Sequence, residues 1–130
     1  MVEVVVLSRE VFEGLLAMAR EVHPLEMLAL LRGRKKGGEV YVEELLFAPL
    51  STHSESSVHF RLDLLPIDFT IVGLAHSHSS GIGEPSIEDM HNFVGRVMLI
   101  LTPPYRGVED IHAFDGSGNR LRVKVSSPRP

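Results

Sequence analysis

Two histidines and a carboxylate stand close together in the segment HSHSSGIGEPSIED, residues 76–89. His76 and His78 are two residues apart, and side chains at that spacing in a strand point to the same face. Imidazole nitrogens are common zinc ligands, and a catalytic zinc takes three protein ligands and keeps one position open. Asp89, on a later element, can supply the third ligand. The spacing therefore predicts a metal site made of His76, His78 and Asp89.

The residues before Asp89 allow the chain to return to the end of the strand. Gly81 and Gly83 permit a sharp loop, and Pro85 restricts the approach to the next element. Ser86 can cap a short helix whose first turn contains Asp89. Each half of the pattern also has an ordinary explanation, namely a pair of surface histidines and a capping serine. Their combination behind an apolar strand favours the metal site.

The composition of the sequence limits the classes of protein to which it can belong. The 130 residues are 44% hydrophobic and 23% charged, which predicts one globular domain. We expect residues 1–125 to form it and residues 126–130 to be a frayed tail. The sequence has no cysteine, so a metal must be held by His, Asp or Glu. A net charge of −4 disfavours nucleic acid, and no apolar run reaches the roughly 20 residues of a membrane span. We therefore expect a cytoplasmic protein.

Apolar and alternating runs predict mostly strands, with two helices. An amphipathic pattern after Ser8 predicts a helix over residues 9–22, and Ser86 begins a short helix over residues 86–93. Polar residues 50–57 indicate a loop, and 35–39 and 115–119 indicate turns. The predicted strands are 2–7, 25–31, 40–49, 58–63, 70–78, 96–103, 110–114 and 121–125. Periodicity alone leaves 25–31 open to a buried helix as well as a central strand.

The metal-binding segment resembles the signature of the JAMM (MPN+) zinc metalloproteases, a family of deubiquitinating isopeptidases with archaeal and bacterial relatives. The family pattern is H-S/T-H-P-x5-P-S-x-x-D. This sequence departs from it at Ser79, where proline is usual, and matches it at His76, Ser77, His78, Pro85, Ser86 and Asp89. Because position 79 is not a ligand, the departure concerns the stiffness of the loop more than the chemistry. The resemblance extends over most of the chain.

The resemblance implies a fold of the α/β (α+β) class, an MPN-type curved mixed β-sheet flanked by one long and one or more short helices. It also implies a catalytic glutamate between the first helix and the next apolar strand. Glu26 in HPLEMLALLRG occupies that place, with Gly33 following the strand. A solvated helix residue or a strand-edge charge is the alternative, although a carboxylate among apolar residues is costly to bury without a partner.

By the same resemblance, the protein is expected to be a zinc-dependent peptidase or isopeptidase. Zn²⁺ would activate water and polarise the scissile carbonyl. Glu26 would be the general base, and Ser86 would donate a hydrogen bond to the oxyanion. The expected substrate is a ubiquitin-like or sulfur-carrier protein, cleaved after its extended C-terminal tail. Strand 58–63 lies in the region that grips this tail in relatives.

Two alternatives from other classes are weighed. A non-catalytic MPN-type scaffold is one, but scaffold members typically lose ligands, whereas the full set is present here. A zinc deaminase would need H-x-E and P-C-x-x-C, and neither occurs in the sequence. Among the remaining histidines, His91 is favoured to support a ligand because it is near Asp89. The others are expected to be structural or surface residues: His23, His53, His59 and His112.

Overall fold

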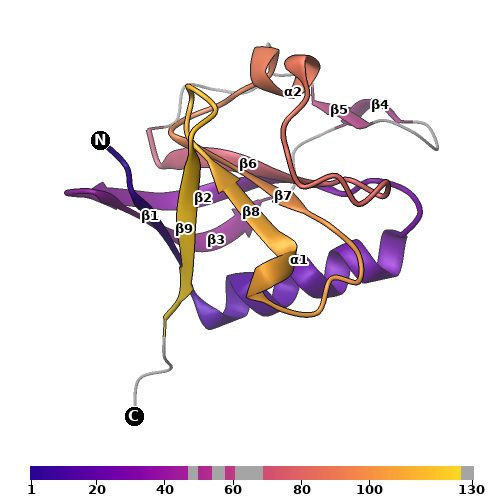
Figure 1. The fold of residues 1–130 in the computed structure, drawn as a ribbon, viewed down its shortest axis with the longest axis horizontal. Coiled ribbons are helices and arrows are strands. Elements are labelled where there is room, and N and C mark those ends of the chain that lie inside the picture. The colour runs from indigo at the N-terminus through magenta and orange to yellow at the C-terminus, as the bar shows by residue number, and fades with distance from the viewer. Residues whose placement is uncertain (47–49, 54–57, 61–68, 127–130) are drawn as a thin grey trace.

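The computed structural model describes residues 1–46, 50–53, 58–60 and 69–126, and Figure 1 shows their arrangement. The helices are α1 (Arg9–Val22), α2 (Ile87–His91) and a short 3-10 helix, η2 (Val108–Asp110). The strands are β1 (Val4–Leu7), β2 (Leu28–Lys36), β3 (Glu39–Leu46), β4 (Leu50–His53), β5 (Val58–Phe60), β6 (Ile71–Ser77), β7 (Val97–Leu101), β8 (Ile111–Phe114) and β9 (Arg120–Val125).

Most of the strands form one mixed sheet that closes into a barrel in the order β1-β3-β2-β6-β7-β8-β9. β1 closes the ring by pairing in parallel with both β3 and β9, and β6 pairs in parallel with β7. The remaining neighbours in the barrel are antiparallel. β4 and β5 make a separate two-stranded sheet. The predicted α+β class, with a curved mixed sheet and flanking helices, is confirmed.

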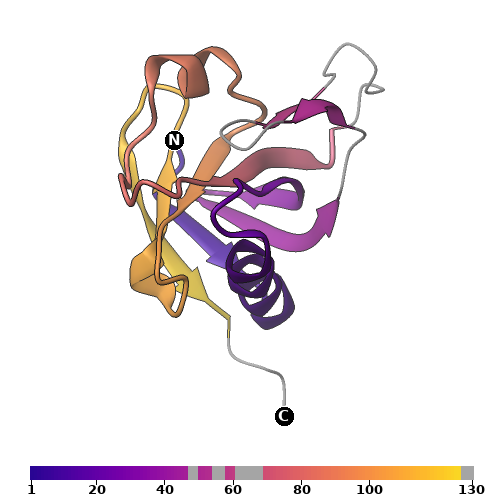
Figure 2. The ribbon, with the colours of Figure 1, turned by 90° about the vertical axis from the view of Figure 1, so that its right-hand side faces the viewer.

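Helix α1 forms where the sequence predicts it. Ser8 caps it, since the Ser8 hydroxyl accepts a hydrogen bond from the backbone N–H of Val11 at 3.1 Å. Its buried side chains recur at helical spacing on one face, and they are Val11, Leu15, Leu16 and Ala19. Figures 1 and 2 place α1 on one side of the barrel and α2 with the β4–β5 sheet on the opposite side.

The core has two parts because the central strands are buried on both faces. Along β7, Val97, Leu99 and Leu101 join the larger cluster, which includes the buried face of α1. Met98 and Ile100 point the other way and join a smaller cluster with Phe114. All five side chains of β7 are at most 1% exposed. Burial on both faces explains why β7 reads as an unbroken apolar run.

The structure decides the ambiguous segment and corrects one prediction. Residues 25–31 do not form a buried helix, because β2 starts at Leu28 and pairs with β3 and β6. The predicted loop over 50–57 is wrong for residues 50–53, which form β4 by pairing with β5. Cross-strand hydrogen bonds, rather than an apolar pattern, make this polar segment a strand. Residues 54–57 and the second half of predicted strand 58–63 lie outside the described residues.

The C-terminal end of the barrel is held by main-chain contacts. The backbone N–H of Ser126 donates to the carbonyl of Leu7 at 2.8 Å, and its hydroxyl contacts the same oxygen at 3.3 Å. Residues 127–130 of the expected tail lie outside the described residues. None of the helices in the described ranges is long and apolar enough to cross a membrane.

We predict that Leu99→Ala strongly destabilises the fold. Leu99 is fully buried in β7, so truncation leaves a cavity, and the free energy of unfolding should fall by about 2–5 kcal/mol. Ile87→Ala is the matched control, because Ile87 is 80% exposed and its loss should change that free energy by less than about 0.5 kcal/mol. Urea denaturation followed by circular dichroism measures both. Equal losses in the two variants would contradict the two-faced burial of β7.

Candidate metal centre

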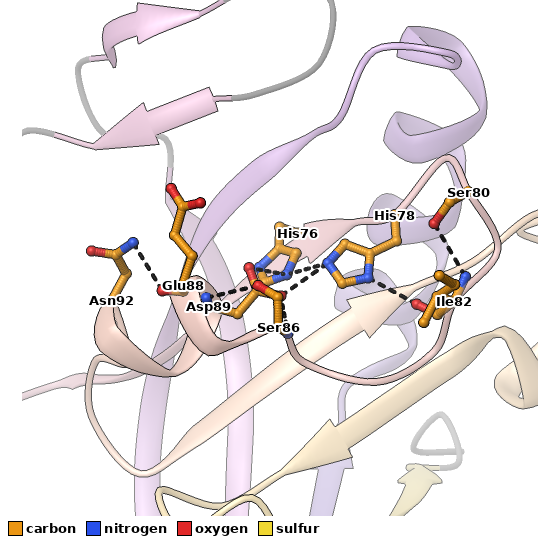
Figure 3. Close-up of polar contacts among 8 residues, drawn as sticks. All are labelled: His76, His78, Ser80, Ile82, Ser86, Glu88, Asp89 and Asn92. Carbon is orange, nitrogen blue, oxygen red and sulfur yellow. Dashed lines mark hydrogen bonds and ion pairs between the residues drawn. The ribbon is translucent and has the colours of Figure 1, made fainter.

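The three predicted ligands meet at the end of β6, as Figure 3 shows. The Nε2 atoms of His76 and His78 are 3.1 Å apart. The Asp89 carboxylate reaches both rings, with Oδ2 at 3.1 Å from His78 Nε2 and Oδ1 at 3.4 Å from His76 Nε2. The structure therefore brings together all three residues that the spacing predicts.

Strand pairing sets the direction of both histidines. His76 lies in β6 between Leu28 of β2 and Ile100 of β7. His78 follows the last residue of β6, but its backbone N–H still donates to the carbonyl of Leu101 at 2.9 Å. The extended pairing carries the alternation of side chains one residue past the strand. Both imidazoles consequently point to the same face.

A capping box fixes the third ligand. The Ser86 hydroxyl accepts a hydrogen bond from the backbone N–H of Asp89 at 3.0 Å. In return, the backbone N–H of Ser86 donates to Asp89 Oδ2 at 2.8 Å. The cap predicted at Ser86 is confirmed, and the same carboxylate both closes the cap and reaches the histidines. Capping and ligation are thus not alternatives here.

The loop after β6 orients the His78 ring. Nδ1 of His78 lies 2.8 Å from the carbonyl oxygen of Ile82. A carbonyl only accepts, so Nδ1 carries the hydrogen, and in the neutral ring Nε2 keeps a free lone pair. Gly81 makes this turn possible with a φ of 85°, a conformation that side chains disfavour.

Two residues of later strands support this loop, namely His112 of β8 and Arg120 of β9. The Arg120 guanidinium lies 3.4 Å from the carbonyl oxygen of Gly83 and 3.3 Å from His112 Nδ1. A Cβ atom on Gly83 would lie 2.7 Å from the His112 ring, so only glycine fits this contact. His112 Nε2 is in turn 3.0 Å from Thr102 Oγ1.

This support was not expected from the sequence. The sequence favoured His91, but its side chain is exposed at the end of α2, whereas His112 is the histidine that contacts the ligand loop. The contact joins residues far apart in sequence, so no local pattern signals it.

Asp89 carries a negative charge in contact with both imidazoles. Burial raises the pKa of the Asp89 carboxyl, but hydrogen bonds with His76 and His78 outweigh it and hold that pKa well below its usual range. For His78, the hydrogen bond with Asp89 raises the pKa most, burial lowers it, and the Ile82 carbonyl and the charges of Asp89 and Glu26 raise it further. A carboxylate that stays ionised beside two imidazoles is suited to a cation.

The three donors fit zinc. One donor atom from each of the three side chains lies within 4.8 Å of the others, and the two imidazole Nε2 atoms are 3.1 Å apart. Donor atoms about 2.0–2.1 Å from a tetrahedral zinc ion lie about 3.3 Å from one another, so the imidazole pair is close to the separation that zinc needs. The side chains of His76, His78 and Asp89 are 11%, 14% and 19% exposed, so the cluster remains open on one side. Two imidazoles and one carboxylate with an open side form the donor set of a catalytic zinc site.

Glu26 approaches the same face from the segment before β2. Leu28 is paired with His76, and Met27 exchanges two hydrogen bonds with Ser77. Continuing this antiparallel register places Glu26 opposite His78. Paired residues of antiparallel strands project to one face, so half-buried Glu26 shares the face of the two histidines. Its contribution to the raised pKa of His78 agrees with that placement.

The chain is similar to known proteins over most of its length. Residues 8–115 match the family described as prokaryotic homologs of the JAB domain. A probable metalloprotease of Haloferax volcanii is 38% identical over 124 residues, covering 89% of this chain and 76% of that protein.

Solved structures share the fold. A JAB1/MPN domain protein from Archaeoglobus fulgidus has a TM-score of 0.67 at 26% identity, covering 93% of this chain and 98% of that one. A structure described as JAMM, a metalloprotease-like zinc site in the proteasome and signalosome, has a TM-score of 0.68 at 25% identity. The match covers 98% of this chain and 100% of that one.

We predict one zinc ion per chain, lost when a ligand is removed. His76→Ala and Asp89→Ala each leave two donors and should reduce zinc content to a small fraction of one equivalent. Ser86→Ala should retain it, because the backbone N–H of Ser86, not its hydroxyl, holds Asp89 Oδ2. Elemental analysis of untagged, dialysed protein gives the stoichiometry. Full zinc content in His76→Ala, or none in the wild-type protein after zinc addition, would refute this ligand set.

Proposed function

This chain belongs to the prokaryotic JAB-domain family of metalloproteases, and on that premise we propose that it cleaves the peptide or isopeptide bond after the C-terminus of a ubiquitin-like or sulfur-carrier protein. The observation that carries the proposal is the meeting of His76, His78 and Asp89 at one open point with Glu26 on the same face. A metal held only for stability needs no carboxylate beside it and is usually closed by four protein ligands.

Glu26 is the general base in this proposal. When zinc is bound, it supplies Lewis-acid chemistry that polarises a carbonyl and lets water attack near neutral pH. Glu26 takes the proton from the attacking water and delivers it to the leaving amine as the bond breaks. Its place opposite His78 brings a carboxylate to the side of the ligand cluster without making it a ligand.

Ser86 is positioned to stabilise developing negative charge. Its hydroxyl oxygen accepts from the Asp89 N–H, which leaves the hydroxyl hydrogen available to a substrate. The side chain is exposed at the start of α2, next to the ligand cluster. In the proposed reaction it donates to the carbonyl oxygen that becomes an oxyanion.

An extended tail suits the surroundings of the site. Ile82 and Ile87, which are 61% and 80% exposed, lie on the loop and helix that carry His78 and Asp89. Such exposed apolar side chains can cover an apolar residue of an incoming tail. The β4–β5 sheet lies on the same side of the barrel as α2, and we propose that β5 receives the tail as an added strand.

Glu26→Gln tests the catalytic assignment. Glutamine keeps the size of the side chain but cannot take a proton, so turnover should fall by at least about 10² while zinc content stays at the wild-type value. Cleavage of a linear fusion to a ubiquitin-like or sulfur-carrier protein measures turnover, and elemental analysis measures zinc. A zinc-loaded variant that cleaves at the wild-type rate would remove Glu26 from the mechanism.

Glu88→Gln is the matched control for charge removal. Glu88 neighbours Asp89 on α2, but Figure 3 shows its side chain directed away from the two histidines. This variant should keep both turnover and zinc. A loss of turnover equal to that of Glu26→Gln would mean that net charge near the site, rather than proton transfer, limits the rate.

The tail-binding role of β5 is tested by proline. Phe60 ends β5, and Leu62 lies outside the described residues. Proline at either position removes a backbone N–H that an added strand would use, so Phe60→Pro and Leu62→Pro should raise KM and leave zinc content unchanged. Steady-state cleavage of the same fusion gives KM. Folded variants with wild-type kinetics would place the tail elsewhere.

The scaffold alternative makes a different prediction from the same assays. A non-catalytic module would bind the modifier without cleaving it, and Glu26→Gln would then leave every measured property unchanged. The complete set of donors and the carboxylate beside them favour the enzyme.

A further inference from the structure

Ser77, between the two histidines, is fully buried on the opposite face of β6. Its hydroxyl oxygen accepts a hydrogen bond from the backbone N–H of Met27 at 2.8 Å, and its own N–H donates to the carbonyl of Met27 at 3.1 Å. The Ser77 hydroxyl oxygen therefore accepts the hydrogen bond that a backbone carbonyl oxygen would accept in a regular antiparallel pair of strands. Met27 is itself only 3% exposed, so its N–H has no access to water as a substitute partner.

We propose that Ser77 is a positioning residue that sets the location of Glu26 beside the three predicted metal ligands. This inference rests on the proposed role of Glu26 as general base. Glu26 stands in the connection between α1 and β2, outside any helix or strand, and the Met27–Ser77 hydrogen bonds are the nearest fixed points to it. They tie the residue after Glu26 to the residue between the two histidines.

The arrangement separates two tasks along three consecutive residues. His76 and His78 face the candidate metal site, while Ser77 faces the core and holds the segment that carries Glu26. Loss of the hydroxyl would leave the imidazoles on their face but release the Met27 N–H. A shift of about 1 Å in a reacting group can lower a rate by about 10². The expected effect is therefore on kcat and not on metal content.

Ser77→Ala and Ser77→Thr form the test pair. In Ser77→Ala, kcat for cleavage of a linear modifier fusion should fall by roughly 10 to 10²-fold, with KM within about twofold and one zinc per chain. Ser77→Thr keeps the hydroxyl and should recover most of the lost kcat. In the metal-free protein, amide hydrogen exchange of Met27 should be faster in Ser77→Ala and close to wild type in Ser77→Thr.

The double variant Ser77→Ala/Glu26→Gln separates positioning from general damage. If Ser77 acts through Glu26, adding Ser77→Ala to Glu26→Gln should lower kcat by less than about twofold, because the base is already absent. A full further loss would show that Ser77 acts on something else and would overturn the proposal. Ser126→Ala, which removes a serine hydroxyl that donates to the backbone carbonyl of Leu7, is the control and should leave kcat and Met27 exchange unchanged.

Failure of this inference differs from failure of the proposed function. If the wild-type protein cleaves no modifier fusion, the proposed function fails, and unchanged Met27 exchange in Ser77→Ala would still overturn the positioning role. If the wild-type protein is active, wild-type kcat in folded Ser77→Ala overturns the inference alone. Should Ser77→Ala not fold, Ser77→Cys takes its place, since it keeps a small side chain but replaces the hydroxyl oxygen with a weak acceptor. Wild-type kcat and Met27 exchange in Ser77→Cys would then overturn the proposal.

Discussion

The contact of one carboxylate with two imidazoles is the constraint on which the site depends. Asp89 reaches both His76 and His78, and it can do so only if the short helix α2 returns to the end of β6. The loop between them therefore has to turn sharply and pass close to the sheet. Gly81 provides the turn, Gly83 allows the approach to His112, and the Ser86 cap fixes the carboxylate. The resulting donor atoms of the three side chains lie within 4.8 Å of one another, close enough to share one metal ion.

Strand β6 carries predicted metal ligands as well as buried residues. β6 is paired on both edges, with β2 and β7, and its end carries two of the predicted ligands on one face and the buried Ser77 on the other. The buried hydroxyl of Ser77 connects these faces by binding the segment that precedes β2. A site built on a central strand is held by the whole fold, whereas a site on loops alone would be held by few contacts.

Local patterns predicted the parts of the structure that local forces decide. Helix α1 and its Ser8 cap, the alternation of His76 and His78, and the Ser86 cap follow from spacing along a few residues. Strand β4 did not, because its polar residues pair by backbone hydrogen bonds with β5. The support of the ligand loop by His112 and the Met27–Ser77 contact also escaped prediction. Both join distant segments, and only the register of the barrel brings them together.

Zinc dependence of cleavage tests the account most directly. The protein is stripped with a chelator, dialysed, and assayed on a linear fusion to a ubiquitin-like or sulfur-carrier protein before and after titration with zinc. The account predicts no cleavage in the metal-free protein and a rate that rises with zinc and saturates near one equivalent per chain. Cleavage at an undiminished rate in verified metal-free protein would contradict it, because Glu26 and Ser86 alone would then suffice for hydrolysis.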